Sequence, residues 1–288
     1  MREKQDALKA VARRYFGAAA AVPEASSEFP SYVLKAPSTD ITTMGSGLRV
    51  ASETVVGAET ATVGVWIDAG SRYETASNNG AEHFLEHMDF KGTDKRTQQQ
   101  LEVEIENMGG HLNAYTSREQ TVYCAKVFKD DVGRAVEILS DILLNSKLDP
   151  SAIERERDVI LREMAEVNKQ QEELLLDHLH ATAFQGPGLG RTILGPEENI
   201  CSLSKADLTD YISTHYTAPR MVIAGAGAID HSQLCDLSEE HFGMLPSAPK
   251  DGLEVAFDPA VFTGSDIRVK FDSDNTAHVA LAFEGASW

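Results

Sequence analysis

Two histidines and a glutamate stand together at His83, Glu86 and His87, in the pattern H-x-x-E-H. On a helix, residues four apart project from one face, so the two imidazoles could hold a single zinc ion. A nearby carboxylate that does not bind the ion can take a proton from the attacking water, and Glu86 has this position. The pattern also fits a surface helix with two solvated histidines. A zinc hydrolase therefore requires a third ligand elsewhere in the chain.

The surrounding residues predict helices that would carry these ligands. Asn79 and Gly80 suit a helix entry before the histidines, and Gly92 suits an exit. Further along, a charged stretch over 151–183 contains no glycine or proline and is expected to form one long helix. Its acids that could supply the third ligand are Glu156, Glu163 and Glu166. Their spacing does not choose among them, because acids on a charged helix usually face solvent.

The rest of the pattern predicts an α+β fold. Strand-like apolar runs occupy 48–51, 61–67, 112–116, 121–128 and 221–226. Helical periodicity marks 97–108, 132–143, 205–215 and 232–242, the first of these opening with a capping box. Strands and helices do not alternate strictly, which favours an α+β layer fold over a parallel α/β fold.

The amino-acid composition indicates which kinds of partner and compartment suit this chain. The chain of 288 residues has 45 acidic and 26 basic side chains, giving a formal net charge of −19. This charge disfavours binding to nucleic acid and favours basic partners or simple solubility. Three dispersed cysteines form no C-x-x-C pair, which argues against a thiolate metal site and indicates a reducing compartment. No run of apolar residues approaches the length of a membrane span.

The N-terminal region, 1–44, is expected to be an extension. Residues 1–22 place basic and apolar side chains at helical spacing, which fits a mitochondrial transit peptide and equally an ordinary amphipathic helix. The following residues, 23–40, contain several prolines and serines and are expected to form an irregular lead-in.

The folded part is expected to contain a main domain and the start of a second one. The main domain covers 45–245, and a linker with prolines and a glycine follows at 246–252. Within 253–288, residues 277–287 echo 61–71. This repeat predicts the first strands of a second homologous domain, truncated at the end of the sequence. A chance match between two strands is the alternative.

Three segments together resemble a known family: 83–87, 106–119 and 154–163. They are similar to the pitrilysin-type zinc metallopeptidases with an inverted motif, and within these to the β-type subunits of mitochondrial processing peptidases. The resemblance implies a metallohydrolase domain with a mixed β-sheet and helices packed on one side. It also implies that Glu163 is the third zinc ligand and that Glu156 orients a zinc ligand without binding the ion itself.

The same resemblance implies residues that bind a substrate. Asn113, Ala114 and Tyr115 match an edge strand to which an extended peptide adds as a further strand. Glu173 and Asp177, one helical turn apart, match an acidic pair that receives the arginine of a presequence. Taken alone, these residues also fit the interior of a sheet and two solvated acids.

The implied function is cleavage of N-terminal targeting presequences from imported mitochondrial precursor proteins. It would require one zinc ion, Arg-containing presequence peptides and a related, non-catalytic α-type subunit, in the matrix or on the matrix side of the inner membrane. One alternative is a core structural subunit of respiratory complex III, with the other subunits of that complex as partners. Another is a general peptide-degrading relative, for which Glu173 and Asp177 would have no special use.

This sequence departs from the family at two positions. Glu82 and Asp89 flank the histidines where the family has small residues. Three carboxylates on one side of the helix are expected to raise the proton affinity of Glu86 and to shift the pH optimum upward. The family's second domain closes over the substrate, and most of it is absent from this sequence, so activity of the chain alone is not predicted.

Overall fold

The computed structural model describes residues 38–185, 188–270 and 275–285. The chain divides into two compact units, Met1–Ser38 and Thr39–Trp288, and every element described below belongs to the second. The expected transit peptide lies outside the described residues.

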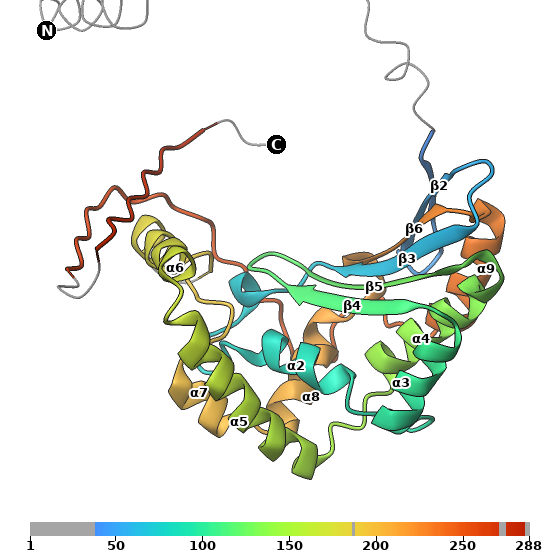
Figure 1. Ribbon diagram of the computed structural model, residues 1–288, viewed down its shortest axis with the longest axis horizontal. Helices are drawn as coiled ribbons and strands as arrows, with labels where there is room; N and C mark the ends of the chain where they lie inside the picture. Colours follow the sequence, from blue (N-terminus) through green and yellow to red (C-terminus); the bar gives the residue numbers. More distant parts are fainter. Residues whose placement is uncertain (1–37, 186–187, 271–274, 286–288) are drawn as a thin grey trace, which may run out of the picture. The chain divides into compact units, whose positions relative to one another are not determined.

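A mixed β-sheet forms one layer of the fold (Figure 1). Its described strands are β1 (Asp40–Thr43), β2 (Arg49–Thr54), β3 (Thr60–Ile67), β4 (His111–Thr116), β5 (Thr121–Phe128) and β6 (Met221–Gly227). They lie in the order β1-β2-β6-β3-β5-β4, so β1 and β4 form the two edges. The last strand, β6, is parallel to β2 and antiparallel to β3, which makes the sheet mixed.

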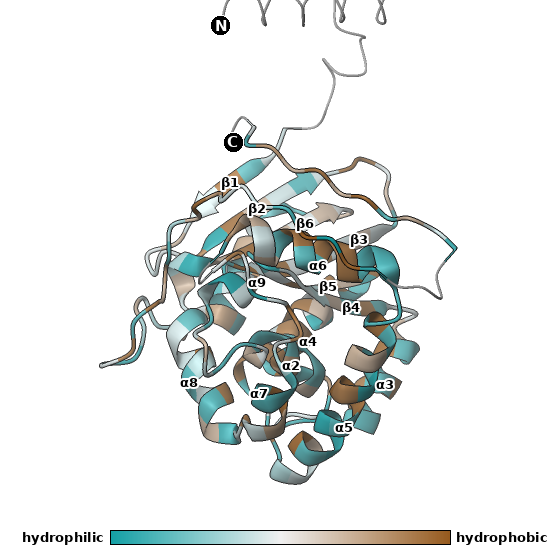
Figure 2. Ribbon diagram, turned by 90° about the vertical axis from the view of Figure 1, so that its left-hand side faces the viewer, coloured by the Kyte–Doolittle hydropathy of each residue, from teal (hydrophilic) through white to brown (hydrophobic). Residues whose placement is uncertain are grey.

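Helices cover one face of this sheet (Figure 1). They are α2 (Ala81–Asp89), α3 (Gln98–Asn107), α4 (Val132–Leu144), α5 (Pro150–Val167), α7 (Glu197–Ser202), α8 (Lys205–His215) and α9 (His231–Phe242), with α6 (Gln171–Ala183) at one end of the sheet. Hydrophilic and hydrophobic residues both occur along α5 and α8, as expected for helices with one buried face (Figure 2). The arrangement confirms the predicted α+β class and the one-sided helical layer.

The predicted helix over 151–183 is wrong in one respect, because it is two helices. The first ends at Val167 with Asn168 as its C-cap, and Gln170 has an extended backbone with φ −88° and ψ 103°. No glycine or proline marks this break. Beyond it, Ala183 is the buried residue of α6, so this second helix does not continue the packing of the first on the core.

Two short elements were not predicted. The strand β1 has four exposed residues, so it lacks the alternation of apolar and polar side chains that identifies a half-buried strand. The helix α7 has six residues, fewer than the window over which helical periodicity becomes visible.

The C-terminal segment forms neither helix nor strand in the described parts of 253–285. Its large apolar side chains that are exposed include Phe257, Val261, Ile267, Val269, Val279, Leu281 and Phe283. It contacts α6 where the Thr263 amide donates to the Ala183 carbonyl at 2.7 Å. The start of a second domain therefore stays a prediction. Among the helices described, none is long and apolar enough to cross a membrane.

A close backbone contact fixes the turn between β4 and β5. The Arg72 amide, in the loop after β3, donates to the Arg118 carbonyl at 2.8 Å. A Cβ atom on Gly70 would lie 2.6 Å from the Ser117 carbonyl oxygen and 2.7 Å from that of Arg118. Since these neighbours are backbone atoms, they cannot move aside by changing a rotamer.

Gly70→Ala should therefore lower the free energy of unfolding by about 2 kcal/mol, because the turn must shift to admit the methyl group. Gly45→Ala is the matched control, since a Cβ atom on Gly45 meets nothing within 4 Å. Urea unfolding of both variants measures the difference. Equal stability of the two variants would show that the loop accommodates the side chain.

Candidate metal centre

The histidine helix α2 begins at a buried cap. Gly80 is its N-cap, with φ 101° in the left-handed region that favours glycine. The buried Glu74 carboxylate accepts hydrogen bonds from the Gly80 and Glu82 amides, each at 2.9 Å, and from the Asn79 side chain at 2.7 Å. Burial raises the pKa of Glu74 to about 7, although these donors oppose the rise. Sequence reasoning missed this cap, because Glu74 lies outside the usual capping position.

Three side chains converge on one point from two helices. His83 and His87 project from α2, and Glu163 projects from α5, which packs on α2. Glu163 Oε2 lies 3.7 Å from His83 Nε2 and 3.2 Å from His87 Nε2. One ligand atom from each residue lies within 4.8 Å of the other two. In a tetrahedral site with bonds near 2.0–2.1 Å, ligand atoms stand about 3.3 Å apart, so the three residues can hold a metal ion.

The protonation states of His83 and Glu163 suit metal binding. Burial, and the charge of His87, lower the pKa of His83 to about 4, which keeps this imidazole neutral with a free lone pair. The hydrogen bond from His87 lowers the pKa of Glu163, although partial burial opposes it. Burial also acts to lower the pKa of His87, but hydrogen bonds to two carboxylates outweigh it and raise that pKa. A carboxylate and a neutral imidazole are the protonation states that ligate metals.

Glu156 and Lys91 lie next to the cluster, on the far side of His87 from Glu163. Glu156 Oε2 lies 3.2 Å from His87 Nδ1, the ring nitrogen that faces away from Glu163. Its other oxygen pairs with Lys91 Nζ at 3.0 Å. The family resemblance implied this place for Glu156, whereas no sequence pattern indicated the contact with Lys91. The third acid considered, Glu166, is exposed and pairs with Lys169 at 2.7 Å.

Glu86, on the histidine helix α2, contacts the end of the edge strand β4. The Thr116 hydroxyl, on the last residue of β4, donates to Glu86 Oε2 at 2.5 Å. Burial of the carboxyl raises the pKa of Glu86, and the hydrogen bond from Thr116 and the charge of His87 oppose this rise. Sequence reasoning placed Thr116 on the strand but did not foresee its contact with Glu86.

Glu82 and Asp89 are buried, so they do not crowd an exposed helix face. The Tyr216 hydroxyl donates to Glu82 at 3.3 Å, whereas Asp89 lies beside Tyr123 and Ser146 without a hydrogen bond of normal geometry among the described residues. Burial raises the pKa of each acid to about 8. The raised pKa of Glu86 follows first from its own burial, so the expected effect of these two acids is not its main cause.

The residues expected to bind a substrate lie on β4 and α6. Asn113, Ala114 and Tyr115 belong to β4, which pairs with β5 on one side and forms the sheet edge on the other. On α6, Asp177 pairs with the Arg118 guanidinium and accepts a hydrogen bond from the Thr192 hydroxyl at 2.9 Å. Glu173, one turn earlier, is exposed.

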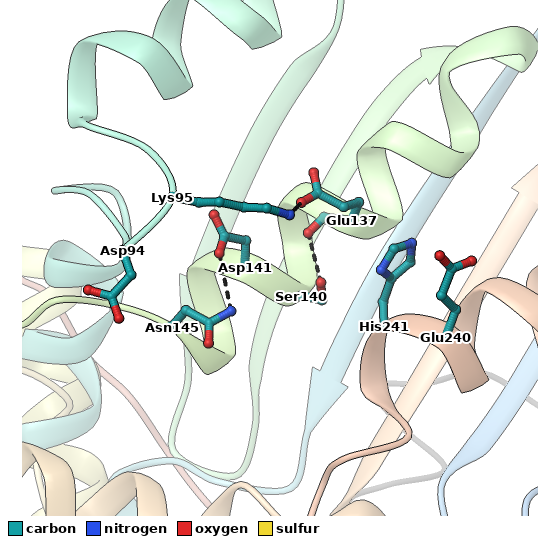
Figure 3. Close-up of a pocket in the computed structure, with 8 residues that line it drawn as sticks. All are labelled: Asp94, Lys95, Glu137, Ser140, Asp141, Asn145, Glu240 and His241. Atoms are coloured by element: carbon teal, nitrogen blue, oxygen red, sulfur yellow. Dashed lines mark hydrogen bonds and ion pairs between the residues drawn. The ribbon is translucent and has the colours of Figure 1, made fainter.

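A separate cavity of about 410 Å³ does not include any expected site residue. It lies between the loop before α3, the helix α4 and the end of α9 (Figure 3). Its lining residues are Asp94, Lys95, Glu137, Ser140, Asp141, Asn145, Glu240 and His241. Within it, Lys95 pairs with Glu137, and Asn145 donates to Asp141 at 3.1 Å, so some of its polar groups pair with one another.

Comparison with protein families identifies the fold. Residues 49–197 match the family model described as Insulinase (Peptidase family M16), and residues 202–288 match that of the Peptidase M16 inactive domain. The chain belongs to peptidase family M16. The cluster of His83, His87 and Glu163 lies within the first of the two matched segments.

Individual members of peptidase family M16 are similar over most of the chain. A mitochondrial-processing peptidase subunit beta from Blastocladiella emersonii is 60% identical over 91% of this chain and 56% of its own length. The protein of that name from Homo sapiens is 59% identical over 89% of this chain and 52% of its own. This chain thus spans about half the length of the curated relatives it matches.

Two solved structures have a similar fold over most of this chain. A protease from Helicobacter pylori superposes with a TM-score of 0.71 at 22% identity, covering 78% of this chain and 54% of that one. A peptidase M16 inactive domain from Pseudomonas fluorescens has a TM-score of 0.70 at 14% identity, again over 78% of this chain and 54% of that one. At these identities the likeness concerns the fold alone.

Asp89→Asn should change how stability depends on pH. Burial raises the pKa of Asp89 from 3.8 to about 8, so between these values the folded chain retains a proton that the unfolded chain releases. The free energy of unfolding of the wild type therefore falls as the pH rises through this range. The variant lacks this linkage and should gain about 1–3 kcal/mol over the wild type between pH 5 and pH 8.

Urea unfolding at pH 5, 6.5 and 8, with a chelator present, measures this gain. Asp251→Asn, at an exposed position, is the control and should follow the wild type. Parallel pH profiles for wild type and Asp89→Asn would contradict the prediction.

Proposed function

We propose that this protein is a zinc metalloendopeptidase that removes N-terminal presequences from imported mitochondrial precursors. It would be the catalytic β-type subunit and work with a related α-type subunit. The observation that carries the proposal is the convergence of His83, His87 and Glu163 beside Glu86, at the end of an edge strand. Zinc-dependent cleavage of an extended peptide uses these three features together: a ligand set, a base and a surface that holds the peptide.

The donor set fits zinc. Two imidazoles and one carboxylate are a common set of protein ligands in catalytic zinc sites, which leave one position open. His83, His87 and Glu163 would hold the ion, which when bound would polarise the scissile carbonyl and make a water molecule more acidic. The spacing of the three ligand atoms and the neutral state of His83 support this choice.

Glu86 would move the proton. It would take a proton from the attacking water and pass it to the leaving amine as the peptide bond breaks. A raised pKa suits both steps, because the carboxyl must first accept the proton and then release it. The Thr116 hydroxyl holds one carboxylate oxygen, Oε2, which leaves Oε1 for the water.

The substrate would add to the sheet at β4. An extended peptide can hydrogen-bond to the free backbone groups of an edge strand, and Asn113, Ala114 and Tyr115 would provide them. Because Thr116 ends this strand and contacts Glu86, a peptide held along β4 would be brought to the base. Beyond the strand, Glu173 and Asp177 would bind an arginine of the presequence.

The names of the relatives support a mitochondrial location for this protein. Several are named mitochondrial-processing peptidase subunit beta, and on this basis we place the protein in the mitochondrion, in the matrix or on the matrix side of the inner membrane. A net charge of −19 suits basic presequences. A core subunit of complex III would not require a metal-ligand cluster beside the half-buried Glu86, so we favour the peptidase.

Glu86→Gln should abolish the general-base step. In the full-length protein with its α-type partner, kcat for a presequence peptide should fall by about 10²–10⁴-fold, while the zinc content stays near one ion per chain. Glu166→Gln, on α5 at an exposed ion pair, should match the wild type. Presequence cleavage and metal analysis are measured on the same preparations. A zinc-loaded wild type that cleaves no presequence, or an active Glu86→Gln, would refute the proposal.

Glu156→Gln should weaken metal binding without removing a ligand. Its carboxylate lies 3.2 Å from His87 Nδ1, and loss of such a supporting group lowers metal affinity by about 10–100-fold. Competition with a chromogenic chelator measures the zinc Kd. Glu154→Gln, two residues earlier and exposed, is the control. An unchanged Kd for Glu156→Gln would mean that this carboxylate does not support His87.

A further inference from the structure

One arginine of this chain already contacts the acidic pair on α6. Arg118 lies in the turn between β4 and β5, and its Nη2 atom pairs with Asp177 Oδ1. The Arg118 side chain is 14% exposed. Its Nε atom is buried and has no hydrogen-bond partner among the described residues, so the ion pair with Asp177 is the main polar contact of this guanidinium.

The turn that carries Arg118 is held firmly. The Ser117 hydroxyl donates to the Gln120 carbonyl at 2.7 Å and accepts from the Gln120 amide at 3.0 Å. The Arg72 amide donates to the Arg118 carbonyl at 2.8 Å, next to the close approach at Gly70. Arg118 therefore projects from a fixed point at the end of β4.

By contrast, α6 has little packing of its own. Ala183, at its last position, is the buried residue of this helix. Asp177 is tied to Arg118 on one side and to the Thr192 hydroxyl on the other. The Thr192 carbonyl in turn accepts from the Asn79 side chain at 2.9 Å, just before α2. Asp177 thus links α6 to the turn after β4 and, through Thr192, to the residue before the N-cap of α2.

We propose that Arg118 is a positioning residue for arginine recognition, which holds Asp177 and α6 at a set place beside the end of β4. This inference rests on the proposed function. Arg118 neutralises one of the two acids, so Glu173, Asp177 and Arg118 together carry one negative charge, which matches one substrate guanidinium. A carboxylate offers about four lone-pair sites, and Arg118 and Thr192 each use one on Asp177, so Asp177 can still accept from a substrate.

Paired peptides test this role in the full-length protein with its α-type partner. One peptide is an Arg-containing presequence, and the other has that arginine replaced by alanine. Arg118→Gln should raise KM for the arginine peptide about tenfold, with kcat and the alanine peptide little changed, because a displaced α6 no longer presents the acids. Arg118→Lys should restore part of the loss, since it keeps the charge. Arg134→Gln, which removes another ion-paired arginine, is the control.

Two kinetic outcomes would overturn the proposal. A lower KM for the arginine peptide in Arg118→Gln would make Arg118 a competitor of the substrate. Equal losses for both peptides would make its role merely structural.

Hydrogen exchange tests the tether independently of activity. Arg118→Gln should speed amide exchange over 171–183 at least several-fold, while exchange in α5 stays unchanged. Unchanged exchange in α6 would overturn the proposal. If the wild type cleaves both peptides equally, arginine recognition itself fails, whereas the exchange result still decides whether Arg118 holds α6.

Discussion

The packing of α5 on α2 sets the geometry on which the metal centre depends. Ile153 and Ile160 are buried on α5 at a spacing of seven residues, and Glu156 and Glu163 lie on the same stripe. Burial of the two isoleucines therefore turns both acids toward α2. The hydrophobic effect, which has no directional preference of its own, in this way sets the distance between ligand atoms that are 76–80 residues apart in the sequence.

The hairpin of β4 and β5 connects this centre to the surface that would hold a peptide. Its outer strand offers an edge, its last strand residue contacts Glu86, and its turn carries Arg118 to α6. These three features come from six consecutive positions, Asn113 to Arg118. A short, stiff segment thus links Glu86 to α6, a helix that has little packing of its own.

Local patterns predicted the parts of the site that depend on spacing alone. His83, Glu86 and His87 follow from one helical turn, and the strands β3 and β5 follow from their runs of apolar residues. The choice of Glu163 over Glu166 depends on which face of α5 is buried, so it came from a family resemblance. The cap from Glu74, the contact from Thr116 and the burial of Glu82 and Asp89 arise from tertiary packing and left no local signal.

The position of β6 has a consequence for synthesis of the chain. Without Met221–Gly227, the sheet consists of two separate pieces, β1 with β2 and β3 with β5 and β4. A nascent chain that has released His83, His87 and Glu163 would still lack the strand that joins the two pieces of the sheet. The sheet can therefore be completed only after more than 60 further residues have left the ribosome after Glu163, and exposed strand edges in that interval are a natural target for chaperones.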